Sequence, residues 1–173
     1  MSANRHHDPA KRQHLFAALK TMGAACALTV LSWPVPAATE TSLPVVDSLA
    51  DALARALARR EPLLVMVSLH GCAFCKTARE NYLMPMQAEG VPIVQVDMRH
   101  SRVITDFNGK SMTHDQWVRQ REVRIAPTVL FFGRDGQEVA TRLKGAYLPD
   151  FYNAYLEDQL TQARRAVQKQ SPA

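Results

Sequence analysis

The 173-residue chain is predicted to form one α/β domain, with a central mixed four-stranded sheet flanked by helices. The apolar run at 63–69 is typical of a strand buried on both faces. A second apolar run, at 125–132, is rich in residues that favour β-structure. A segment that favours a helix lies between the first run and a second strand at 91–97, so this pair is expected to be parallel, with a right-handed crossover. An alternating run at 138–144 follows a glycine-containing turn and predicts an outer antiparallel strand.

The first 38 residues are predicted to be a secretory signal peptide. A leader with four basic residues precedes an uncharged, mostly apolar run at 21–31, and small residues suited to cleavage stand at 35–38. The apolar run is too short for a comfortable membrane span, although an uncleaved anchor is the alternative. We therefore expect an exported, periplasmic protein.

The net charge and the number of cysteines are both lower without this leader. The whole chain has a formal net charge of +5, but the leader holds four of the 21 basic residues and one of the 16 acidic residues, which leaves +2. So small an excess gives no reason to expect a nucleic-acid partner. Of the three cysteines only Cys72 and Cys75 lie outside the leader. One Cys-x-x-Cys is no disulfide framework, and we interpret it as a reactive pair.

The domain is expected to begin near residue 43 with a helix over 49–60, capped by Asp47 or Ser48. Its leucines recur four residues apart and make one apolar stripe that faces the core. Glu61-Pro62 ends this helix and precedes the first buried strand.

The Cys-x-x-Cys follows that strand directly, across Gly71. Residues 76–83 are good helix formers without glycine or proline, so Cys72 is expected in the first turn of a helix and Cys75 one turn further on. Unpaired N–H groups and the positive end of the helix dipole stabilise a thiolate at Cys72. Cys75 is within reach of a mixed disulfide formed there. The spacing predicts dithiol/disulfide exchange, with the Cys72–Cys75 disulfide as the redox centre and no other cofactor.

The segment after this helix is harder to interpret. Pro85 is expected to end or kink the helix near residue 84. Residues 98–112 are predicted to form a basic, solvated loop with a turn at Phe107-Asn108-Gly109, and a partner surface is the alternative. His100 and His114 are expected at the surface.

Thr113 and Gln116 fit a capping box that opens a helix to about Val123, with Trp117 and Val118 directed inward.

Pro127 opens the second apolar run, where proline is tolerated only at the first position or an edge of a strand. A last helix is expected from Pro149. The domain is predicted to span 43–165, with a frayed tail at 166–173. The inward face of the last helix is predicted to comprise Tyr152, Tyr155, Leu156, Leu160 and Ala163.

Two motifs in this order resemble those of the thioredoxin superfamily. The first is a strand followed by Cys72-Ala73-Phe74-Cys75 and a helix, and the second is Ala126-Pro127-Thr128 before an antiparallel hairpin. The leader and the run at 69–76 resemble the bacterial periplasmic thioredoxin-like proteins associated with sulfur oxidation. The resemblance implies that Pro127 is cis and packs beside the cysteines. It also implies that Ala126 offers backbone hydrogen bonds to a bound substrate, with Phe74 at the same docking surface.

The sequence departs from the thioredoxin pattern at three places. Gly71 stands where tryptophan is usual, and Met66 stands where a buried aspartate helps to deprotonate the second cysteine. The proton acceptor for Cys75 is thus unidentified, with bulk water or Glu80 as guesses. The connection over 97–127 is also longer than in the smallest members.

The sequence therefore predicts a monomeric periplasmic thiol-disulfide oxidoreductase in which Cys72 is the nucleophile and Cys75 the resolving thiol. Its expected partners are a disulfide-containing periplasmic protein and a membrane thiol reductase that supplies electrons. Reduction of substrates is favoured over a disulfide-forming oxidase or isomerase. A redox-inert zinc or copper module built on both cysteines, His70 and Met84 is the alternative from another class.

Overall fold

The structure, a computed structural model, describes residues 42–146 and 149–169. The predicted signal peptide at 1–38 and the end of the predicted tail at 170–173 lie outside the described residues. The helices of the described part are α1 (Leu49–Ala58), α2 (Ala73–Ala78), the π-helical turn η1 (Arg79–Leu83), α3 (Met84–Ala88), α4 (His114–Gln120), the 3-10 turn η2 (Arg134–Gly136) and α5 (Pro149–Lys169). The strands are β1 (Leu63–Ser68), β2 (Ile93–Asp97), β3 (Val103–Thr105), β4 (Ser111–Thr113), β5 (Thr128–Phe132) and β6 (Leu143–Lys144).

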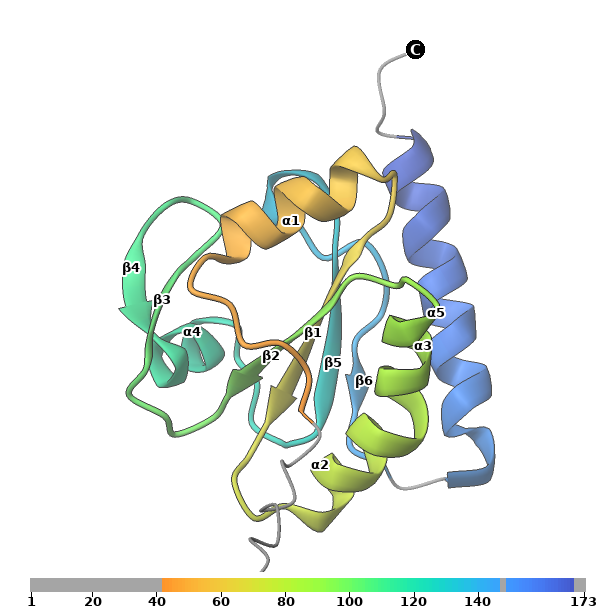
Figure 1. Cartoon of the computed structure of the whole chain (residues 1–173), viewed down its shortest axis with the longest axis horizontal. Helices are drawn as coiled ribbons and strands as arrows, with labels where there is room; N and C mark the ends of the chain where they lie inside the picture. The colour runs from red at the N-terminus through yellow and green to blue at the C-terminus, as the bar shows by residue number, and fades with distance from the viewer. Residues whose placement is uncertain (1–41, 147–148, 170–173) are drawn as a thin grey trace, which may run out of the picture. The chain divides into compact units, whose positions relative to one another are not determined.

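The predicted mixed four-stranded sheet is confirmed, with strand order β2-β1-β5-β6. Strand β1 pairs in parallel with β2 and antiparallel with β5, and β5 pairs antiparallel with β6. Strands β1 and β5 run in opposite directions, and so do β5 and β6. The end of β1, the start of β5 and the end of β6 therefore lie at the same end of the sheet, close to α2 (Figure 1). The Cys-x-x-Cys lies at this end.

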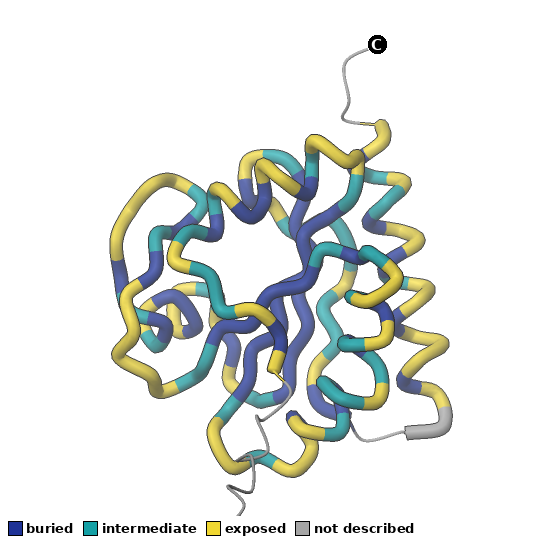
Figure 2. Tube along the Cα trace, viewed as in Figure 1, coloured by how far each residue is buried: buried dark blue, intermediate teal, exposed yellow. Residues whose placement is uncertain are grey.

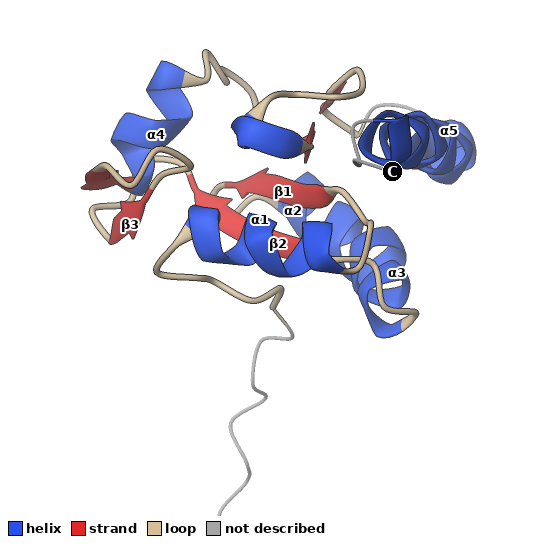
Figure 3. Ribbon diagram, turned by 90° about the horizontal axis from the view of Figure 1, so that it is seen from above, coloured by secondary structure: helices blue, strands red, loops and turns tan. Residues whose placement is uncertain are grey.

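Helices cover both faces of the sheet, and alternate residues of β1 face opposite layers. Leu64 and Met66 pack in a core with α2, α3 and α5, whereas Val65 and Val67 pack in a second core with α1 and α4. All residues of β1 and β5 are buried, and both strands are dark blue in Figure 2. In Figure 3, α4 and α5 stand on opposite sides of the strands. The predicted burial of β1 on both faces is confirmed, and β5 is buried in the same way.

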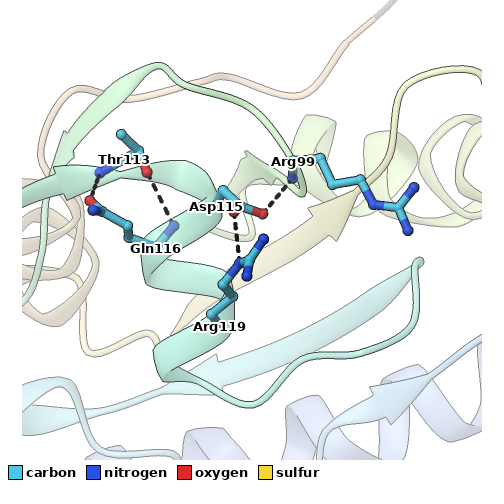
Figure 4. Close-up of polar contacts among 5 residues, drawn as sticks. All are labelled: Arg99, Thr113, Asp115, Gln116 and Arg119. Atoms are coloured by element: carbon cyan, nitrogen blue, oxygen red, sulfur yellow. Dashed lines mark hydrogen bonds and ion pairs between the residues drawn. The ribbon is translucent and has the colours of Figure 1, made fainter.

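Capping residues set where two helices begin, as the sequence indicated. The Ser48 hydroxyl accepts a hydrogen bond from the Asp51 N–H at 3.1 Å and caps α1. Thr113 and Gln116 form the predicted capping box, with reciprocal bonds of 3.2 Å and 2.8 Å (Figure 4). Such a cap contributes about 1 kcal/mol to helix stability.

Of the two predicted outcomes at Pro85, an end or a kink of the helix that follows the cysteines, the helix does not end there. It passes through the π-helical turn η1, in which the Met84 N–H bonds to the Arg79 carbonyl, and continues as α3 to Ala88. Proline lacks an N–H and its ring obstructs the usual bond to the carbonyl four residues back. The wider π-helical turn just before Pro85 carries the chain past this obstruction.

Residues 98–112 are ordered by a hairpin that the sequence did not reveal. Strands β3 and β4 pair antiparallel, and the Asp106 carboxylate accepts the N–H groups of Asn108 and Lys110 to hold the predicted turn. His114 is fully buried rather than at the surface. Its Nδ1 accepts the Asp97 N–H at 3.1 Å, and burial lowers the pKa of the imidazole.

Three expectations about the C-terminal part were wrong. The predicted strand over 138–144 forms only at Leu143–Lys144, with one isolated bridge between Phe132 and Glu138. Helix α5 extends to Lys169 with Val167 at 1% exposure, so the packed domain continues beyond the predicted boundary at 165. Tyr155 is 54% exposed, whereas the other residues predicted for the inner face of α5 are buried.

No helix among the described residues is both long and apolar enough to span a membrane.

Two glycines in turns allow a test of how the hairpin packs on the domain. Gly136 and Gly109 both have positive φ, +64° and +79°, but a Cβ at Gly136 would lie 2.5 Å from Phe107 while one at Gly109 would meet nothing within 4 Å. We predict that Gly136→Ala lowers the free energy of unfolding by about 2–4 kcal/mol and Gly109→Ala by about 1 kcal/mol. Urea denaturation of both variants measures this difference, and equal losses would contradict the predicted clash.

Candidate functional site

Cys72 is the N-cap residue of α2, as the sequence predicted for the first turn of the helix. Its sulfur accepts a hydrogen bond from the Cys75 N–H at 3.1 Å. Gly71, with φ of +72°, allows the chain to turn between β1 and this cap. An N–H bond and the positive end of the helix both favour negative charge on a sulfur at this position. The local structure therefore presents a half-buried sulfur that accepts a backbone N–H at the start of a helix.

Cys75 lies one turn further along and is only 1% exposed. Burial, followed by the hydrogen bond that it shares with the Cys72 sulfur, raises the pKa of the Cys75 thiol to about 12. Contacts with the Leu69 backbone and the Ser68 side chain act in the opposite direction. The two thiols of one helical turn are thus placed in different environments. Both cysteines are free in this structure.

Two polar side chains lie close to Cys75, and sequence reasoning did not assign either to the site. Ser68 ends β1 and is 2% exposed. Tyr152 of α5 lies in the same core cluster as Cys75, and its buried hydroxyl has no hydrogen-bond partner among the described residues. Burial, followed by the charge of Cys75, raises the pKa of Tyr152. Ser68 is the one polar residue in the otherwise apolar run at 63–69, and this exception is the sequence feature that could have pointed to a role beside Cys75.

The position that the resemblance gives to a buried aspartate is apolar here. Met66 is fully buried in the core cluster that contains Cys75. Glu80, one of the guessed proton acceptors, makes no hydrogen bond or ion pair with any part of the chain that the structure describes. Neither residue gives Cys75 a carboxylate partner.

The segment that opens β5 lies against Cys72. The carbonyl oxygen of Ala126 is 3.9 Å from the Cys72 sulfur, and the Ala126–Pro127 peptide bond is cis, as the family resemblance implied. Pro127 has no N–H, and its carbonyl accepts the Gly145 N–H at 2.7 Å, which ties this segment to the end of β6. Two segments separated by more than fifty residues therefore meet at the Cys72 sulfur.

The surface beside Cys72 is partly apolar. Phe74 is 62% exposed, the most exposed of the large apolar residues in the described part of the chain. His70 and Gly71 are also exposed. An exposed aromatic ring next to a reactive thiol is suited to contact with a partner protein.

A metal site would need about four ligands. Within residues 42–146 and 149–169, no three His, Cys, Asp or Glu side chains are grouped so that they could hold a metal ion. His70 therefore does not complete such a cluster with the two cysteines.

A family model described as a thioredoxin-like domain matches residues 49–160, most of the chain. No curated protein sequence matches the chain.

Similar solved structures include thioredoxins from three organisms. A thioredoxin from Nicotiana alata is 20% identical, with a TM-score of 0.46, and the match covers 72% of this chain and 97% of that one. Mitochondrial thioredoxin 3 from Saccharomyces cerevisiae is 20% identical, with a TM-score of 0.45 and coverage of 70% and 96%. Thioredoxin O2 from Arabidopsis thaliana is 16% identical, with a TM-score of 0.47 and coverage of 68% and 93%.

The different environments of the two thiols predict different rates of alkylation. Because burial raises the pKa of Cys75 to about 12, very little of this thiol is ionised at pH 8, and the side chain is also inaccessible to the reagent. We predict that iodoacetamide modifies Cys72 of the fully reduced protein at least about a hundredfold faster than Cys75. Peptide mapping by mass spectrometry during the reaction identifies the modified residue. Modification of Cys75 first would contradict the assigned environments.

Proposed function

Because the chain belongs to the thioredoxin-like domain family, we propose that it is a thiol-disulfide oxidoreductase with Cys72 as nucleophile and Cys75 as resolving thiol. The observation that supports this most strongly is the contrast within one helical turn. Cys72 is half-buried and its sulfur accepts a backbone N–H. Cys75 is buried and its pKa is raised.

In the first step the Cys72 thiolate attacks one sulfur of a substrate disulfide. A bond forms between Cys72 and that sulfur, and the other substrate sulfur leaves as a thiolate. The Ala126 carbonyl lies 3.9 Å from the Cys72 sulfur, so backbone groups of this segment are placed to bind the substrate chain in an extended form. Phe74 supplies exposed apolar surface for the same contact.

In the second step Cys75 loses its proton and attacks the Cys72 sulfur. The Cys72–Cys75 disulfide forms, and the remaining substrate sulfur leaves as a thiolate. The substrate gains two electrons and the protein loses two. Attack on the substrate forms a bond at Cys72 and so removes the negative charge from that sulfur. The hydrogen bond that holds the proton on Cys75 is then weakened, which favours ionisation at that moment.

We further propose that the protein reduces its substrates in the periplasm and is itself reduced by a membrane thiol reductase. An oxidant requires strong stabilisation of its reduced form. The residues between the cysteines, Ala73 and Phe74, offer neither charge nor side-chain hydrogen-bond donors for that purpose. The resemblance to periplasmic proteins associated with sulfur oxidation belongs to this proposal, as does a monomeric state. A disulfide-forming oxidase or isomerase is the competing direction, and metal binding by the two cysteines the competing class.

We predict that Cys75→Ser retains its substrate as a stable mixed disulfide, because Cys72 can attack but nothing resolves the product. Cys72→Ser should trap none, since the remaining thiol is buried. Neither variant should reduce insulin in the presence of dithiothreitol faster than dithiothreitol alone. Non-reducing electrophoresis of periplasmic extracts and insulin turbidity are the measurements.

Trapping by Cys72→Ser alone would reverse the roles of the two cysteines. Stoichiometric zinc or copper in the purified reduced wild-type protein, without insulin reduction, would favour the metal-binding alternative.

A further inference from the structure

A polar cavity of about 300 Å³ lies beside the segment that contacts Cys72. Its walls come from the stretch that leads into β5 and from the region of β6. The lining residues that bear charge are Glu122, Arg124, Arg142 and Lys144.

Charge in this cavity is unbalanced, because the three cations face one carboxylate. Arg142 is already engaged, since its guanidinium binds the Glu138 carboxylate and donates to the Arg121 carbonyl at 2.8 Å. Arg124 and Lys144 are exposed, and neither forms an ion pair or side-chain hydrogen bond in the part of the chain covered by the structure. Two cations without an ion-pair partner, set against the single carboxylate of Glu122, leave the cavity with a net positive charge that attracts an anionic group.

The backbone connects this cavity to the reactive sulfur. Ile125 lines the cavity and precedes Ala126, whose carbonyl oxygen is 3.9 Å from the Cys72 sulfur. Thr128 also lines it, pairs with Lys144 across β5 and β6, and donates its hydroxyl to the Ile125 carbonyl at 2.7 Å. An extended substrate advances about 3.3 Å per residue. A substrate that lies along this segment would therefore carry side chains within a few residues of its cysteine to the cavity.

We propose that this cavity is an acidic-side-chain subsite that selects disulfide substrates with Asp or Glu close to the attacked cysteine. The subsite deepens the proposed exchange function and rests on it for its substrate. Arg124 and Lys144 bind the carboxylates, while Glu122 opposes them from the same wall. The ion pairs that Arg124 and Lys144 would form with the substrate carboxylates are exposed to solvent. The gain in binding free energy is therefore modest and decreases with ionic strength.

The experiment uses three synthetic peptides of identical length, each with one cysteine joined to thiopyridine by a disulfide. The cysteine is flanked by two Glu, two Gln or two Lys. Release of thiopyridone by the reduced protein gives a second-order rate constant for each peptide. We expect wild type to favour the Glu peptide over the Lys peptide about fivefold at low salt, with the Gln peptide between them.

Matched variants separate the subsite from general charge. Arg124→Gln with Lys144→Gln should reduce the preference to about one, and Glu122→Gln should increase it. Arg165→Gln with Lys169→Gln removes the same charge from exposed positions on α5 and should leave the preference unchanged. Equal rates for the three wild-type peptides, or a preference that survives the loss of Arg124 and Lys144, would overturn the proposal.

A second measurement needs no exchange chemistry. The Cys72→Ser, Cys75→Ser protein is titrated with the same peptides carrying serine for cysteine, and amide chemical shifts are followed by NMR. Shifts at Arg124 and Lys144 with the Glu peptide alone support the subsite even if the protein reduces no disulfide, in which case only the proposed exchange function fails. Equal shifts with the Lys peptide overturn the subsite.

Discussion

The hydrogen bond from the Cys75 N–H to the Cys72 sulfur, 3.1 Å long, is the contact on which the rest of the site depends. It exists because Cys72 is the N-cap of α2, and that position is fixed by the strand before it and the turn at Gly71. The same geometry points the side chain of Cys75 into the core. One backbone arrangement therefore favours charge on the outer sulfur and disfavours charge on the inner one.

Sheet topology brings the remaining parts of the site to these cysteines. Strand β5 is antiparallel to β1, so it begins where β1 ends. Strand β6 is antiparallel to β5 and ends at the same end of the sheet. Ala126 consequently lies beside Cys72 although it is distant in sequence, and the polar cavity lies next to the same segment. In the core cluster that contains Cys75, Met66 stands at the position that the resemblance gives to a buried aspartate, and Tyr152 packs in the same cluster.

Local patterns allowed much of the fold and the site to be predicted. The buried strands, the capping box at Thr113 and the Cys-x-x-Cys at a helix start depend on neighbouring residues, which a single sequence displays. Other features depend on contacts that a sequence does not display. The burial of His114 follows from its bond to Asp97, and the path of the helix through Pro85 follows from a π-helical turn that has no simple signature. The polar cavity forms only when β5 and β6 pair, because residues from both regions line it.

The central claim, that Cys72 and Cys75 form a reversible two-electron exchange pair, is tested most directly by equilibration of the protein with glutathione buffers of graded potential. The fraction with a Cys72–Cys75 disulfide is measured by mass spectrometry after acid quenching. The account predicts complete, reversible conversion between dithiol and intramolecular disulfide, with a midpoint closer to about −270 mV than to about −120 mV. A protein that forms only glutathione adducts, or that shows no intramolecular disulfide at any potential, would contradict it.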